Sequence, residues 1–408
     1  MKEKRKRKSK ILSPIKISFS EIFHIYFFLL RSFIYKHKYF HYIYKMIPNN
    51  SEINDIRQIA DFKGETFSRF KKSEVRKQII ESMMNCKIEK ACYWSAELIC
   101  AGQYGDLWET IFHYIGKHIH LGNPKIIPYI EMRFQIFRNI ITSGKIQYEL
   151  QLRNHYTIRN LFAEIITILT YSNRKNSFET IKIKREEEYD ITQISERLKA
   201  PSMKYAEPIF KKEDAKELFI AINEFAYNIS SDIKSMIHAC YWIEWIIDFE
   251  ILCRKRKTPC ICEKRSYIPI EDKFQKDPIW IIWDSIFHQS VIINNSFITK
   301  LIQSLHNIFC IKYTHGSPKK RKYLLYYAIS LLTENVPTNT DLIKNKELIK
   351  MVTSKINDVY KQIKKNEQSP GTDYLFSNLE KQANYENTIR KLELMDSIDF
   401  VPRTENNV

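Results

Sequence analysis

Apolar residues recur every three or four positions along most of the chain from Met46 onward, which is the spacing of one helix face. Helices with such a stripe are predicted around residues 75–83, 107–118, 127–141, 218–229 and 349–363. Two of them follow acidic pairs at capping-box spacing, Asp106 with Glu109 and Asp214 with Glu217. The pattern predicts an all-α fold, a multi-helix bundle of two halves plus a C-terminal helical extension. Residues 178–191, where apolar and polar residues alternate, are the one candidate for a small strand.

Polar and proline-containing stretches divide this helical pattern into candidate domains. We expect an N-terminal helical domain over 46–171, a charged linker over 172–211, a C-terminal helical domain over 212–367, and a C-terminal helix and tail over 368–408. The string Ala-Cys-Tyr-Trp occurs at 91–94 and again at 239–242. It has two interpretations, a duplication of one helical half or two similar buried helix starts.

Residues 1–45 have a different composition from the rest of the chain. They contain twelve Lys or Arg against two Glu, and aromatic residues crowd among the basic ones. The longest run without a charge, Ile22 to Leu30, is shorter than the roughly 20 residues that span a bilayer. Three interpretations stay open: a leader upstream of an authentic start at Met46, an amphipathic helix on a membrane surface, or an additional ordered helix. The abrupt composition change at Met46 favours the leader.

Glycine is scarce, with 8 residues in 408, so the chain has little material for tight hairpins or phosphate-cradling loops. The motifs G-x-x-x-x-G-K-[ST], G-x-G-x-x-G, G-x-S-x-G and H-E-x-x-H are missing from the sequence. This favours a protein without catalytic activity and without a cofactor. An enzyme with an unfamiliar site would have to use the scattered residues Glu97, Glu131, His118 and His120.

Cysteine and histidine residues are the candidate metal ligands of the sequence. Cys253, Cys260 and Cys262 form C-x6-C-x-C in a basic loop, but a tetrahedral zinc site needs a fourth ligand from elsewhere. His113 and His118 are five residues apart, which does not place them on one helix face. We therefore expect free thiols in a reducing compartment, a helix C-terminus at the histidines, and no metal site.

Basic residues gather in two clusters that interrupt apolar helices. The chain carries a net charge of +18, of which +10 belongs to residues 1–45. The first cluster is Arg254, Lys255, Arg256, Lys257, Lys264 and Arg265, and the second is Lys312, Lys319, Lys320, Arg321 and Lys322. Such clusters neutralise phosphates, and the neighbouring Tyr313 and Tyr323 are candidates for stacking on bases. The alternative is that both are solvated loops in a chain whose lysine content follows AT-rich codon usage.

Several strings resemble an uncharacterised protein family of nucleocytoplasmic large DNA viruses. They are CYWSAELICAG (92–102), HIHLGNPK (118–125), NEFAYNI (223–229), CYWIEWI (240–246) and YKQIKKNEQSPGTDYLF (360–376). The resemblance covers nearly all of 46–408 and leaves out residues 1–45. It implies a viral protein that acts in the host cytoplasm or nucleus at a replication site. It implies no particular activity and no site residues.

A second, local resemblance covers residues 91–124. The pattern A-C-Y-W-x-A-x-x-I-x-A-G, a helix and then L-G-N-P is similar to a helical hairpin in the collar of clamp-loader-like AAA+ ATPases. The ATPase module of those proteins is missing from this sequence, so the resemblance does not imply ATP hydrolysis. It implies an oligomerisation element.

From the sequence we expect a non-catalytic, nucleic-acid-associated accessory protein of viral DNA replication or transcription. Its partners would be DNA or RNA and other viral proteins, with no stable membrane insertion. The main alternative is a structural or scaffold protein that binds only other viral proteins.

Overall fold

A computed structural model describes residues 51–143, 149–179, 181, 183, 195–258 and 260–368 of the 408-residue chain. Within these ranges the regular secondary structure is helical, and extended pairing is limited to one antiparallel bridge between Glu65 and Lys71. The predicted all-α fold is confirmed. The sequence predictions for 1–45 and 369–408 lie outside the described residues. So does most of 178–191, where the described Ile181 and Ile183 belong to no strand.

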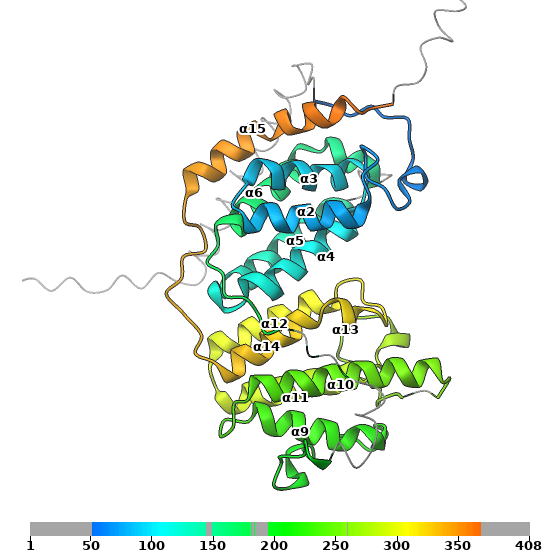
Figure 1. Ribbon diagram of the computed structural model, residues 1–408, viewed down its shortest axis with the longest axis vertical. Coiled ribbons are helices and arrows are strands. Elements are labelled where there is room, and N and C mark those ends of the chain that lie inside the picture. Colours follow the sequence, from blue (N-terminus) through cyan, green and yellow to red (C-terminus); the bar gives the residue numbers. More distant parts are fainter. Residues whose placement is uncertain are drawn as a thin grey trace, which may run out of the picture. The chain divides into compact units, whose positions relative to one another are not determined.

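The helices fall into two groups along the chain, as Figure 1 shows. The first group is α2 (Lys72–Met84), α3 (Ile88–Cys100), α4 (Tyr104–Tyr114), α5 (Ile126–Thr142) and α6 (Tyr156–Tyr171). The second is α9 (Phe219–Ile229), α10 (Met236–Lys255), α11 (Ile279–Ile293), α12 (Ser296–Cys310), α13 (Ser317–Lys320) and α14 (Lys322–Thr333), and α15 (Lys346–Lys364) follows. The short helices are η1 (Ile59–Phe62), η2 (Ile115–Ile119), η3 (His120–Gly122), η4 (Glu149–Asn154), η5 (Met203–Tyr205), η6 (Lys216–Leu218) and η7 (Asp272–Phe274).

The predicted apolar stripes form the buried faces of the helices. Helix α2 buries Val75, Ile79 and Met83, which follow one another at intervals of four residues in the sequence. The two predicted capping boxes do not form. Asp106 lies inside the first turn of α4, after the N-cap Gln103, and its carboxylate is 3.1 Å from the Lys72 ammonium.

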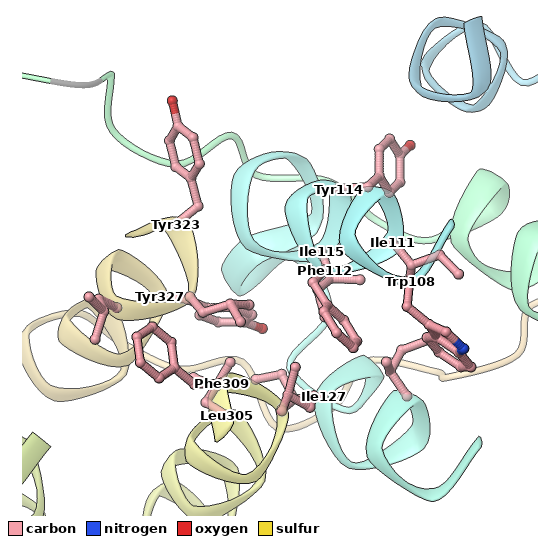
Figure 2. Close-up of a cluster of buried hydrophobic side chains, with 14 of the residues drawn as sticks. Trp108, Ile111, Phe112, Tyr114, Ile115, Ile127, Leu305, Phe309, Tyr323 and Tyr327 are labelled. Atoms are coloured by element: carbon pink, nitrogen blue, oxygen red, sulfur yellow. The ribbon is translucent and has the colours of Figure 1, made fainter. Parts of the chain in front are cut away.

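One hydrophobic core joins the two groups of helices. In Figure 2, side chains of α4, η2 and α5 point toward side chains of α12 and α14. The residues that meet there include Phe112, Ile115, Ile127, Leu305, Phe309 and Tyr327. The described residues accordingly belong to a single compact unit that begins at Ser51. The domain boundaries expected from the sequence stay predictions.

Helix α15 packs against helices of the first group rather than against its neighbours in the sequence. The Arg159 side chain of α6 donates to Asn357 Oδ1 at 2.9 Å, and its guanidinium carbon lies 3.9 Å from the centroid of the Tyr360 ring. Beyond the helix, the Ile56 N–H donates to the Gln368 carbonyl at 3.1 Å. The first and last described residues of the unit therefore lie together.

Among the described residues, none of the helices combines the length and the apolar character that crossing a bilayer requires.

Candidate nucleic-acid interface

Four residues of the first basic cluster lie at the C-terminal end of α10. Arg254 and Lys255 belong to its last turn, Arg256 is the C-cap and Lys257 follows with a positive φ of 59°. All four are exposed. Arg254 also forms an ion pair with Glu250 one turn earlier. A helix C-terminus carries partial negative charge, which stabilises cations there.

The other two residues of the first cluster, Lys264 and Arg265, lie in different environments. Lys264 is exposed, and its ammonium is 2.8 Å from Asp272 Oδ2. The Arg265 side chain is fully buried and donates to Asp214 Oδ1 at 2.6 Å and to Asp284 Oδ2 at 2.9 Å. Burial acts to raise the pKa of Asp214, but the Arg265 hydrogen bonds and two backbone N–H groups outweigh it and lower that pKa. Arg265 is thus a structural cation that a phosphate does not reach.

The second cluster divides in the same way. Lys312, two residues after the end of α12, and Lys319 and Lys320 of α13 are exposed. Arg321 is 4% exposed; its Nε is 3.1 Å from Glu109 Oε1 and its Nη1 donates to the Phe309 carbonyl. The Lys322 ammonium is 2.9 Å from Glu244 Oε1 and its side chain is largely covered. Arg321 and Lys322 therefore neutralise carboxylates of the fold instead of facing a ligand.

Asp277, at the start of α11, joins the loops that carry the two clusters. The Tyr313 hydroxyl donates to Asp277 Oδ2 at 2.9 Å, and His315 Nδ1 is 3.0 Å from the same oxygen. The Cys262 thiol donates to the Asp277 carbonyl at 3.2 Å. Burial raises the pKa of Asp277, while the bonds from Tyr313 and His315 and the nearby Arg254 charge act to lower it.

The two basic clusters lie close to each other, because residues next to each of them line the same small cavity. Residues of α10, of the start of α11 and of the segment 313–318 line a cavity of about 10 Å³, with Glu250 and Pro318 among them. Glu250 is one turn before Arg254, and Pro318 directly precedes Lys319. The structure therefore places the ends of the two clusters beside each other. Six cluster residues are exposed and take part in none of the ion pairs above: Lys255, Arg256, Lys257, Lys312, Lys319 and Lys320.

The aromatic side chains expected to stack on bases do not reach solvent. Tyr313 is 5% and Tyr323 8% exposed, because both rings belong to the core around α12 and α14. Two groups that the sequence analysis did not single out lie at the junction instead. Lys276, next to Asp277, and His315 are both exposed. In the sequence, Lys276 and His315 are marked as candidates only by their position in the two loops that carry the clusters.

The candidate cysteine ligands are free thiols. Burial raises the pKa of Cys260 and of Cys262 to about 12, so both are neutral at physiological pH. Across the described ranges, no set of three His, Cys, Asp or Glu side chains is arranged to hold a metal ion.

The candidate histidines around η2 and η3 have local partners in the fold. His118 Nδ1 is 3.3 Å from Asn176 Oδ1. The His120 ring stacks on Tyr327 with 4.6 Å between centroids. Burial lowers the pKa of His113 and of His120 to about 4, so these rings are neutral at pH 7.

The two candidate catalytic carboxylates join different elements. Glu97 is fully buried on α3 and accepts from the Ser68 hydroxyl at 2.6 Å, which fixes the segment before α2. Glu131 on α5 accepts from the Asn307 amide of α12 at 2.6 Å. Each carboxylate has a structural role that its contacts explain.

No protein-family model, curated protein or solved structure matches the chain.

Proposed function

We propose that this chain is a non-catalytic nucleic-acid-binding protein that contacts phosphates through one basic surface. We define the basic surface as the six exposed residues of the two clusters that take part in none of the ion pairs described above: Lys255, Arg256, Lys257, Lys312, Lys319 and Lys320. Lysine and arginine side chains bind the phosphate backbone through charge, with release of counterions.

The observation that carries this proposal is the junction at Asp277. Two clusters that end and begin 47 residues apart in the sequence, at Arg265 and Lys312, meet through Tyr313, His315 and α10. Cations that lie beside each other act on consecutive phosphates of one strand, whereas scattered cations do not. The proposed role in viral DNA replication or transcription rests on the resemblance to the protein family of large DNA viruses.

The test is binding of the full chain to a single-stranded and a duplex oligonucleotide across a salt series. Contact with about 4–6 phosphates predicts a slope of log affinity against log salt of about −3 to −4 for a single strand. Replacing the six residues of the basic surface by serine is expected to remove most of that slope.

A matched variant separates the surface from net charge. It replaces six exposed lysines outside the basic surface by serine, namely Lys63, Lys87, Lys90, Lys300, Lys346 and Lys350. Both variants lose the same charge, so binding that depends on net charge alone would fall equally in both. Equal affinities for the two variants would contradict the proposal; loss confined to the first supports it.

A second candidate function is binding of other proteins. At the end of α11, Val291 is 72% and Ile292 56% exposed. The Gln289 side chain donates to Ser231 at 3.1 Å, which brings the segment of the exposed Ile233 toward this end of α11. Neighbouring exposed apolar side chains favour a protein contact. Replacing Val291 and Ile292 by serine would abolish self-association in sedimentation experiments if this surface mediates it.

A further inference from the structure

A cleft of about 500 Å³ lies between the loop that contains Tyr267 and helices α11 and α12. Its volume falls in the range of small-molecule sites. The side chains that line it include Tyr267, Asp284, Phe287, Gln303, His306 and Asn307.

Aromatic rings form the apolar part of this cleft. Tyr267 is 57% exposed, and Phe287 is half-buried. The His306 ring lies 5.1 Å from the Phe287 ring, between centroids, and is 3% exposed. Burial lowers the pKa of His306 to about 4, so this ring is neutral at pH 7. A planar ring can stack on such a surface.

Amide side chains of α12 form the polar part. Gln303 Nε2 donates to Asn307 Oδ1 at 3.1 Å, and Asn307 Nδ2 donates to Glu131 at 2.6 Å. A primary amide has two N–H donors and a carbonyl acceptor, so each keeps hydrogen-bonding capacity beyond these bonds. Such an amide pairs with a donor and an acceptor on the edge of a base at the same time.

The charges in the cleft select against a phosphate. Asp284 accepts from Arg265 Nε at 2.9 Å and from the Tyr267 hydroxyl. Arg265 is shared with Asp214, and Glu131 adds a further carboxylate behind Asn307. No surplus positive charge comes from these groups, so the cleft suits an uncharged planar ring with hydrogen-bonding edges.

We propose that this cleft binds a single nucleobase, presented by a strand whose phosphates lie outside it. The strand as source of the base rests on the proposed function. Lys264 is exposed and three residues from Tyr267, which is at most about 10 Å along the chain. Its ammonium forms a solvent-exposed ion pair with Asp272, and because such a pair is weak, a phosphate of the strand can replace Asp272 as its partner. This cleft supplies the stacking that the buried Tyr313 and Tyr323 do not.

The experiment compares two strands of equal length and charge on the full chain. One is an oligodeoxyadenylate, and the other has the same sugar-phosphate backbone with abasic residues. Stacking of one base is expected to make the adenylate strand bind about five- to hundredfold tighter. The salt dependence of the two strands should be the same, since both contact the same phosphates.

Two variants assign the difference to the cleft. Tyr267 and Gln303 are both exposed, so the fold should tolerate the substitutions Tyr267→Ala and Gln303→Ala. Each is expected to lower affinity for the adenylate strand toward that of the abasic strand while leaving abasic binding unchanged. Tyr267→Phe keeps the ring and should retain most of the difference. Ile237→Ala, an exposed apolar change on α10, is the control that should change neither.

The possible outcomes separate this inference from the proposed function. Equal, salt-dependent binding of both strands would show that the cleft does not bind a base of the strand. The proposal that the basic surface binds phosphates would then still hold. If neither strand binds, the proposed function fails, and titration with the uncharged nucleosides adenosine and cytidine tests the cleft itself. Saturable binding of a free nucleoside that Tyr267→Ala removes would assign the cleft to a base that no strand presents. Absence of both responses would overturn the inference.

Discussion

At the scale of single residues, two buried guanidinium groups hold distant parts of the chain together. Arg265 joins Asp214, 51 residues earlier, to Asp284 on α11. Arg321 joins α4 through Glu109, 212 residues earlier, to the end of α12. Breaking a buried pair by removing one partner is costly because it leaves an uncompensated charge.

Replacing Arg265 by methionine should therefore lower the free energy of unfolding by about 3–5 kcal/mol, because two carboxylates lose their partner. Urea unfolding followed by tryptophan fluorescence measures this loss. Lys264→Met is the control; it removes an exposed pair with Asp272 and should cost less than about 1 kcal/mol. A similar loss in both variants would mean that the buried charges are not what stabilises this loop.

The same residues show what the sequence could not reveal about the candidate site. Local spacing located the two basic clusters, and their exposed members follow from loop position and charge. Local spacing could not show that Lys264 is exposed whereas Arg265 is buried, because the partners of Arg265 are remote in the sequence. Nor could it indicate that Tyr313 points into the core, since that depends on packing against Trp280 of α11, whose ring centroid is 4.8 Å away.

At the scale of elements, helix positions followed the apolar periodicity, whereas helix ends did not follow the capping patterns. Asp214 was expected to cap a helix, but its carboxylate accepts from Arg265 and from the N–H groups of Lys211 and Glu263. The ion pair with Arg265, which is remote in the sequence, holds the Asp214 carboxylate away from the helix N-terminus that it was predicted to cap. The π-helical turn η2 had no sequence signal, and its close contact with α14 depends on Gly116.

Gly116→Ala should destabilise the protein by about 1–3 kcal/mol through overpacking. A Cβ at this position would lie 2.9 Å from the backbone carbonyl carbon of Tyr323, which cannot rotate away. Gly105→Ala is the matched control, because a Cβ there meets nothing within 4 Å and alanine favours the helix. Thermal unfolding of both variants measures the difference. Equal stabilities would show that η2 and α14 can separate without cost.

At the scale of the whole molecule, the order of helices in the sequence differs from their order in space. The expected C-terminal domain over 212–367 includes α15, and α15 packs against α3 and α6 of the first group. Periodicity predicts that a helix has an apolar face but does not say which helix will cover it. Arg159, Asn357 and Tyr360 supply that specificity.

Tyr360→Ala should lower the free energy of unfolding by about 3–5 kcal/mol, since the ring is 1% exposed. If the shared core makes unfolding cooperative, amide hydrogen exchange should speed up in α10 and α11 as much as in α3 and α6. Met351→Ala, at a position 48% exposed on the same helix, should change little. Faster exchange confined to α3, α6 and α15 would instead identify two independently folding domains.

The position of α15 also has a consequence for the time at which the protein can complete its fold. Arg159 and its partner Asn357 are 198 residues apart, so α6 leaves the ribosome long before the helix that covers it. At ordinary synthesis speeds that interval is about 10–40 s. During this time the nascent chain carries an uncovered apolar helix face, and exposed apolar surface of this kind is what chaperones protect from aggregation.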